Sequence, residues 1–158
     1  MDRIVTPKQM AEAEQASVKL GVSLEELMGN AGEALAKEIL SLAHSKMLDK
    51  VVILSGNGNN GGDGFVCAEF LAEAGVISTV ILMCGKPKTE LSKAAFERLD
   101  KKINVIDKSS CEFNDIINRA DIIADCVFGT GFHGEIKSEL LPYFDDIQKA
   151  QAYKIACD

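Results

Sequence analysis

The chain has 158 residues, enough for one domain with a sizeable hydrophobic core. Its 17 basic and 24 acidic side chains give a formal net charge of −7, which argues against a nucleic-acid-binding or membrane-surface protein. The longest apolar runs, such as residues 80–84, are far too short to span a membrane. No apolar signal core begins the chain, and the five scattered cysteines form no Cys-x-x-Cys pair. We therefore expect a cytoplasmic protein.

The first 45 residues are typical of two helices. Thr6 is a suitable cap for the first, and Ser23 begins the second with the Ser-x-x-Glu spacing of a capping box. Apolar residues then recur at helical period up to residue 42. Gly29 and Gly32 interrupt this stripe, which we interpret as close packing of backbones, with contact of Asn30 to a ligand as the alternative.

From residue 50 onward, strand-like and helix-like segments alternate. The predicted strands are Lys50–Ser55, Val76–Cys84, Ile103–Ile106, Ile122–Phe128 and Tyr153–Cys157. The predicted helices are Gly62–Ala74, Thr89–Lys101, Ser110–Arg119 and Lys137–Ala150. Nearly continuous apolar strands suit a parallel sheet that is buried on both faces. The pattern predicts a single α/β domain over residues 1–158: a Rossmann-like, doubly wound αβα sandwich with a mostly parallel sheet and two extra N-terminal helices.

The most informative segment is residues 56–64, with the sequence GNGNNGGDG. It follows a predicted strand and leads into a predicted helix. Glycine leaves the backbone bare, and a helix N-terminus presents free N–H groups and a positive dipole end. We therefore expect an anionic, phosphate-bearing ligand there. Asp63 near the helix start has capping of that helix as its simplest role.

Two further segments also follow predicted strands. Residues 129–135 (GTGFHGE) are again rich in glycine, and Asp158 follows the last strand. If the strand order is 3-2-1-4-5, these segments and residues 56–63 meet in one crevice at the carboxyl ends of the strands. The second loop suits another phosphate or a ribose edge, with an ordinary mobile loop as the alternative. His133 within it is either an acid–base group or a surface histidine without a role.

Asp125 interrupts the apolar strand 122–128. A carboxylate there is costly unless it is paired, hydrogen-bonded or bound to a cation. Asn60 could share a hard cation with it, since both offer oxygen ligands and no His/Cys cluster suggests a transition metal. Capping of backbone N–H groups by the carboxylate, or pairing with a lysine, are the alternatives.

The spacing Gly56-x-Gly58-x-x-Gly61 also satisfies the dinucleotide fingerprint. That fingerprint expects an acid at the end of the second strand, and residues 83–86 (MCGK) have none. Lys86 and Lys88 could instead bind a ribose phosphate, so an NADP-dependent dehydrogenase is an alternative reading. No set of hydride-transfer partners supports it.

These motifs resemble those of the YjeF N-terminal domain family, the NAD(P)H-hydrate epimerases. Residues 56–64 are similar to its signature, and so are the N-terminal segments 9–10 and 27–32. Residues 125–131 resemble its second motif and 155–158 the start of its third. The resemblance implies an isomerase that interconverts the R and S epimers of hydrated NADH and NADPH, a step of metabolite repair. A non-catalytic nucleotide-binding or dimerising scaffold domain is the alternative from another class.

The resemblance also implies roles for individual residues. Asp158 would be the catalytic group beside the nicotinamide ring and would also contact the substrate, and Asn60 and Asp125 would hold a potassium ion. The remaining implied substrate contacts are Asn59, Asn60, Gly61, Gly62, Asp63, Gly129, Thr130, Gly131, Phe132, His133, Gly134 and Glu135.

The family continues with Pro-Ser-Gly after the aspartate, whereas this sequence stops at Asp158, so we expect a domain truncated at its C-terminal end. The resemblance further suggests a homodimer. Its expected functional partner is an NAD(P)H-hydrate dehydratase, which is fused to the epimerase in some proteins.

Overall fold

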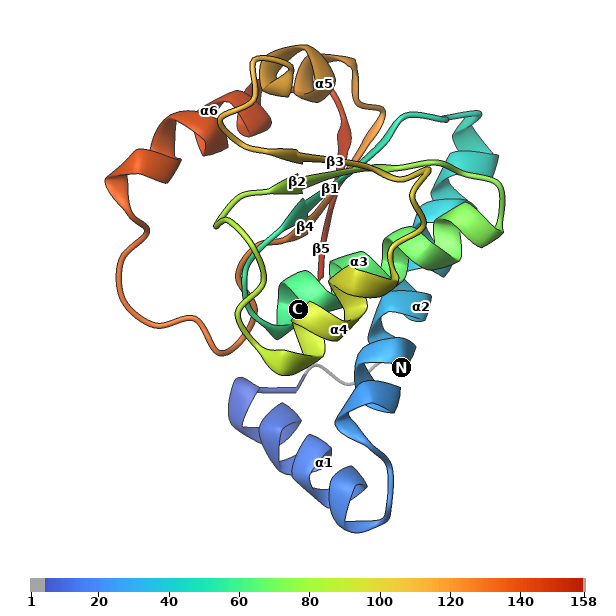
Figure 1. The fold of residues 1–158 in the computed structure, drawn as a ribbon, viewed down its shortest axis with the longest axis vertical. Helices are drawn as coiled ribbons and strands as arrows, with labels where there is room; N and C mark the ends of the chain where they lie inside the picture. The colour runs from blue at the N-terminus through green and yellow to red at the C-terminus, as the bar shows by residue number, and fades with distance from the viewer. Residues whose placement is uncertain (1–4, 158) are drawn as a thin grey trace.

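A five-stranded parallel sheet forms the centre of the protein (Figure 1). The computed structural model describes residues 5–157. The strands are β1 (Val51–Ser55), β2 (Thr79–Leu82), β3 (Asn104–Asp107), β4 (Ile122–Cys126) and β5 (Tyr153–Ala156). Their order is β3-β2-β1-β4-β5, and every neighbouring pair is parallel. The predicted α/β class and strand order are confirmed.

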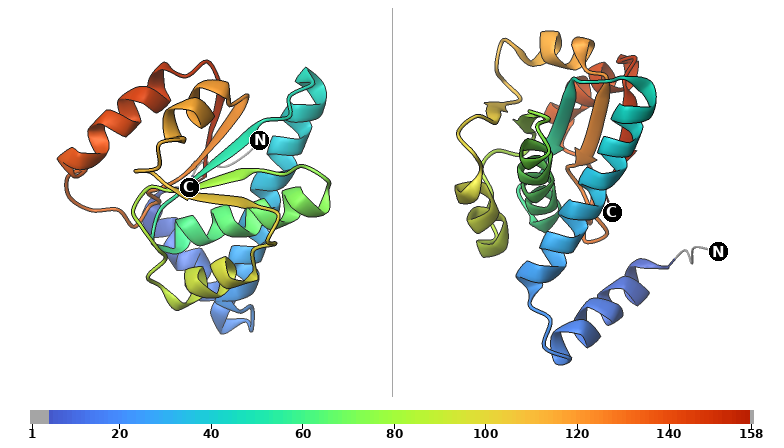
Figure 2. Two further views of the ribbon diagram at one scale, coloured as in Figure 1. Left: turned by 45° about the horizontal axis from the view of Figure 1, so that its top comes forward. Right: turned by 90° about the vertical axis from the view of Figure 1, so that its right-hand side faces the viewer.

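Helices cover both faces of the sheet (Figures 1 and 2). They are α1 (Pro7–Lys19), α2 (Leu24–Lys46), α3 (Asn59–Glu73), α4 (Glu90–Arg98), α5 (Phe113–Arg119) and α6 (Leu141–Lys149), with a short 3₁₀ turn η1 (Ser138–Leu140). The side chains of α2, α3 and α4 share one hydrophobic cluster with one face of the sheet. Those of α5 and α6 share a second cluster with the other face. The two clusters bury both faces of the central strands, which explains why these strands are continuously apolar.

Both N-terminal helices begin where the sequence predicts. The Thr6 hydroxyl accepts a hydrogen bond from the Gln9 N–H at 3.3 Å, and the Gln9 side chain accepts one from the Thr6 N–H at 2.8 Å. Ser23 and Glu26 form the same reciprocal box. None of the residues of α1 is buried, and α1 extends below the layers that cover the sheet (Figure 1).

Helix α3 begins earlier than the sequence predicts. It starts at Asn59 rather than Gly62, and its N-cap is Gly58. Asp63 is therefore the fifth residue of the helix, and its interpretation as a cap is wrong. The glycines explain the difference: a Cβ on Gly62 would lie 2.5 Å from Met28 Cε, and one on Gly61 would lie 2.1 Å from a backbone oxygen. The first turn of α3 can pack here only because these positions lack side chains.

The glycines of α2 divide between two roles. A Cβ on Gly32 would lie 2.6 Å from the Val66 side chain, so close packing of α2 on α3 requires glycine there. Gly29 has open space around it and Asn30 is exposed. The prediction of close packing is therefore confirmed for Gly32 and wrong for Gly29.

The second strand is shorter than predicted. Residues 76–78 precede β2, because Gly75 at φ +84° ends the turn after α3 and the Val76 N–H donates to the Leu71 carbonyl. Strand β5 lies at the edge of the sheet with its side chains largely exposed.

Candidate functional site

A cleft of about 1300 Å³ lies beyond the carboxyl ends of the strands. Its walls come from the start of α3, the segment after β2, the loop after β4 and one side of α1. The predicted site residues that line it are Asn59, Asn60, Asp63, Gly129, Thr130, Gly131, Phe132, His133 and Glu135. The predicted convergence of residues 56–63 with residues 129–135 is therefore confirmed.

The first wall is fixed by backbone contacts between neighbouring strands. The Gly56 N–H donates to the Cys126 carbonyl at 3.0 Å, and a Cβ on Gly56 would lie 2.0 Å from the Val127 carbonyl oxygen. None of the glycines in residues 56–64 has a positive φ, so close approach of other atoms explains Gly56. Because Gly58 offers no side-chain cap, the first N–H groups of α3 stay available to a ligand.

The second wall is the exposed loop after β4. Its Phe132 ring packs on Phe128 with centroids 4.2 Å apart, and the Phe132 N–H donates to the Gly129 carbonyl. Gly129 lies against Asn60, where an added Cβ would be 3.2 Å from the Asn60 Cγ. Gly134 has a φ of +96°, which favours glycine at that turn. The two glycine-rich segments thus touch at Gly129 and Asn60.

Asp63 brings a carboxyl group into this cleft. Burial, and to a smaller extent the nearby charge of Glu14, raises the pKa of Asp63 from its ordinary 3.8 to about 7. Within residues 5–157, neither a hydrogen bond nor an ion pair reaches this carboxyl group. A carboxyl that titrates near neutral pH can both give and take a proton, which suits general acid–base chemistry.

Asn60 lies in the first turn of α3, and Asp125 lies in β4. The Asn60 Nδ2 atom is buried without a hydrogen-bond partner among the described residues. Asp125 is half-buried, and its Oδ1 accepts a hydrogen bond from the Val127 N–H at 3.0 Å. The capping alternative is therefore present, and it uses one carboxylate oxygen. A free carboxylate oxygen and an unsatisfied amide fit the oxygen ligands of a hard cation, provided the amide oxygen turns inward.

Some predicted residues are placed differently. Gly61 and Gly62 are buried in the packing of α3 and do not line the cleft. Gly134 and Asp125 are also absent from its lining. Asp158, the predicted catalytic group, lies outside the described residues, although Cys157 before it does line the cleft. The substrate contacts assigned to these residues stay predictions.

The sequence reading missed two parts of the cleft. Helix α1 contributes four lining residues, namely Pro7, Met10, Ala11 and Glu14. Lys108 and Lys137 line it as well, together with Lys88. The position of Lys108 directly after β3 was a usable signal, because that strand end lies at the same edge of the sheet as the others.

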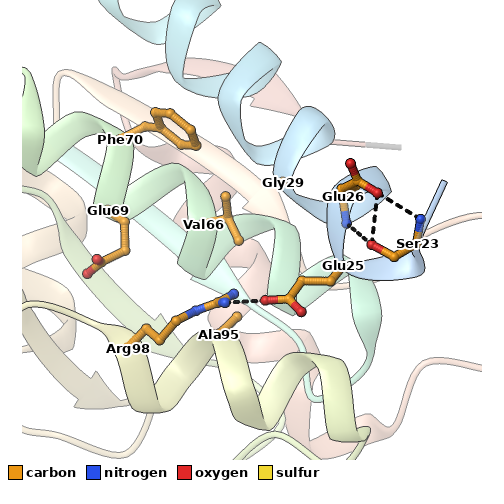
Figure 3. A pocket seen from close by; sticks show the side chains of 9 residues that line it. All are labelled: Ser23, Glu25, Glu26, Gly29, Val66, Glu69, Phe70, Ala95 and Arg98. Carbon is orange, nitrogen blue, oxygen red and sulfur yellow. Dashed lines mark hydrogen bonds and ion pairs between the residues drawn. The ribbon is translucent and has the colours of Figure 1, made fainter.

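A smaller hollow of about 430 Å³ lies between α2, α3 and α4 (Figure 3). Arg98 of α4 forms an ion pair with Glu25 at the start of α2, and the Ser23–Glu26 capping box closes the hollow beside it. Its polar side chains hold the start of α2 in place and leave no convergent set of reactive groups. We therefore assign function to the larger cleft.

Comparison with known proteins shows the family to which the chain belongs. Residues 24–158 match the family described as "YjeF-related protein N-terminus". The chain belongs to this family. The same fold occurs in the crystal structure of yeast ynu0, with a TM-score of 0.85, 23% sequence identity and coverage of 99% of this chain and 70% of that one.

Named relatives of this YjeF-related chain fall into two groups. An NAD(P)H-hydrate epimerase of Elusimicrobium minutum is 33% identical over 99% of this chain and 74% of its own length. One of Nitrosopumilus maritimus is 31% identical over 98% and 72%. A bifunctional NAD(P)H-hydrate repair enzyme Nnr of Archaeoglobus fulgidus is 36% identical over 87% of this chain, but the match spans only 28% of that protein.

Two kinds of feature are absent from the described residues. Between residues 5 and 157, no helix is long and apolar enough to cross a membrane. The same residues contain no group of three or more His, Cys, Asp or Glu side chains that could hold a metal ion. A cation at Asn60 and Asp125 would therefore need amide, carbonyl or water oxygens besides the one carboxylate.

Proposed function

We propose that this YjeF-related domain is an NAD(P)H-hydrate epimerase, an isomerase that interconverts the R and S epimers of hydrated NADH and NADPH. The observation that carries the proposal is the meeting of two glycine-rich segments at one cleft that also contains the Asp63 carboxyl group. The family and the names of the relatives support it.

The cleft suits a dinucleotide in size and in donors. Its volume of about 1300 Å³ exceeds that of ordinary small-molecule pockets. The free N–H groups at the start of α3 suit the pyrophosphate, since a helix N-terminus favours anions. The Thr130 hydroxyl and the backbone of residues 129–131 suit the ribose edges. Binding of these remote parts would orient the nicotinamide ring for reaction.

Epimerisation needs a proton to move twice. The hydrated ring carries a hydroxyl on a carbon bonded to the ring nitrogen, whose lone pair expels the hydroxyl as an acid protonates it. The products are water and a planar cation. Water then adds to either face of the cation, and the carboxylate takes the proton back. Asp158 is the first choice for this acid, and Asp63, with its pKa of about 7, is suited to the same exchange.

We further propose potassium as the cofactor, held by Asn60 and Asp125. When bound, potassium would supply positive charge beside the ligand and fix the contact between the two loops. The Asn60 side chain already packs on Gly129, so holding Asn60 also holds the second loop. We also expect a homodimer, and an NAD(P)H-hydrate dehydratase as functional partner, since some relatives are named bifunctional repair enzymes.

A coupled assay tests the proposal. Purified R-epimer of hydrated NADPH is incubated with the protein and a dehydratase that consumes only the S-epimer, and formation of NADPH is followed. We expect NADPH to form well above the rate without the protein. Replacing Asp158 with Asn should lower the rate about 100-fold if it is the acid–base group, and Asp63→Asn tests the second carboxyl in the same way.

The alternatives give different results. A dehydrogenase would reduce NADP in the presence of an alcohol substrate, so a panel of alcohols distinguishes it. A scaffold domain would not accelerate conversion of the R-epimer at all. Absence of acceleration with a protein that extends beyond residue 158 would contradict the epimerase proposal.

A further inference from the structure

Three lysines that line the cleft lie around Cys84. Lys88 lies in the connection from β2 to α4, Lys108 directly follows β3, and Lys137 directly precedes η1. All three line the cleft together with Cys84. In the described chain, none of their ammonium groups takes part in an ion pair or a side-chain hydrogen bond. Three unpaired cations at one place in a chain of net charge −7 suggest an anionic ligand.

The charges around Cys84 agree with this grouping. Burial raises the pKa of the Cys84 thiol, whereas the positive charges of Lys108, Lys137 and Lys88 lower it. Glu139 is the acidic side chain that faces the same thiol and raises its pKa. Around this thiol the three lysines therefore outnumber the one acid. Glu14 of α1 acts on Asp63, and neither of these acids is among the charges that act on Cys84.

The place of the lysines in the fold indicates which anion they suit. In open α/β sheets that bind dinucleotides, the adenosine ribose lies at the end of the second strand. A carboxylate there binds the free 2′-hydroxyl, and a cation there accommodates a 2′-phosphate. The segment after β2, residues 83–88 (MCGKPK), contains no acid. The Lys88 N–H donates to the Asn57 carbonyl at 2.8 Å and the Asn57 Nδ2 donates to the Cys84 carbonyl at 3.1 Å, so this segment is fixed to the first glycine-rich segment.

We propose that Lys88, Lys108 and Lys137 bind the 2′-phosphate of an NADP-derived dinucleotide and make hydrated NADPH the preferred substrate over hydrated NADH. The inference rests on the proposed function, because it assumes that the dinucleotide occupies this cleft. It adds a specificity site formed by residues outside the two glycine-rich segments. A phosphate monoester carries nearly two charges at neutral pH and three acceptor oxygens, which suits three separate ammonium groups.

Calorimetric titration with two fragments tests this inference. ADP-ribose and 2′-phospho-ADP-ribose differ only in the phosphate, and each is titrated into the full-length protein at one salt concentration. We expect the phosphorylated fragment to bind roughly 10- to 100-fold more tightly, since hydrogen bonds to charged groups are among the stronger ones. Lys108→Gln and Lys88→Gln should each reduce this preference several-fold and leave the affinity for ADP-ribose unchanged. Lys101→Gln is the matched control, because Lys101 is exposed at the amino end of β3, away from the cleft.

The outcomes separate the two proposals. Equal affinities for the two fragments would overturn the phosphate site while leaving the epimerase proposal intact. A lysine variant that weakens both fragments equally would assign the lysines to the pyrophosphate and also overturn it. Failure of ADP-ribose itself to bind would contradict the proposed function.

Discussion

Ionisation of Asp63 should make the protein less stable as the pH rises. Its pKa is raised from 3.8 to about 7 in the folded protein, mainly because the carboxyl group is buried. The folded state therefore holds this proton more tightly than the unfolded state does. The stabilisation is fully present below about pH 4 and is lost as the pH rises through about 7. A difference of one in pKa corresponds to about 1.36 kcal/mol. The folded protein therefore loses about 4 kcal/mol of stability in total, and about 2.5 kcal/mol of this loss falls between pH 5 and pH 8.

Asp63→Asn isolates this effect, because asparagine has nearly the shape of the protonated carboxyl group and cannot ionise. Between pH 5 and pH 8, the free energy of unfolding of the natural protein should fall by about 2.5 kcal/mol relative to that of Asp63→Asn. Urea denaturation at both pH values measures the difference. Asp145→Asn is the control, since Asp145 is exposed on α6 and its replacement should shift stability equally at both pH values. A difference in stability between Asp63→Asn and the natural protein that does not change with pH would show that the pKa of Asp63 is not raised in the folded protein.

Two more predictions follow from the site. Gly56→Ala should cost about 3 kcal/mol of stability, because its Cβ would lie 2.0 Å from the Val127 carbonyl oxygen. Gly58→Ala should cost less than about 1 kcal/mol, because open space surrounds Gly58. Urea denaturation of the two variants measures these costs, and equal costs would contradict the close packing at Gly56. Replacing potassium in the buffer by tetramethylammonium should lower the stability of the natural protein by roughly 2 kcal/mol if a site is saturated, and should leave Asp125→Ala unaffected. Thermal melting in both salts measures this, and an equal response of the two proteins would argue against the cation.

The sequence predicts the layers of this fold well because its apolar runs and caps are local signals. The Thr6 and Ser23 caps and the alternation of strands and helices follow from them. The strand order is assumed from the fold class, and the structure confirms it. It fails where packing between distant segments decides the conformation. Residues 59–61 are typical of a loop, yet they belong to the first turn of α3, because the Gly56 backbone and Met28 leave no room for side chains at Gly61 and Gly62.

Only part of the site can be predicted from the sequence. Segments that follow strands are placed by topology alone, which brings residues 129–135 next to Asn60. The contribution of α1 to the cleft cannot be predicted from the sequence, because a helix without buried residues has no apolar pattern that indicates its position. The raised pKa of Asp63 depends on its burial in the folded protein and on the charge of Glu14, which no motif expresses.

A crystal structure of the protein with bound NADP would show whether one ligand lies between the two glycine-rich segments. We expect phosphate oxygens within hydrogen-bond distance of the N–H groups that begin α3, with residues 129–135 contacting the same molecule. A dinucleotide bound only in the hollow between α2 and α4, or touching one of the two glycine-rich segments alone, would contradict this expectation.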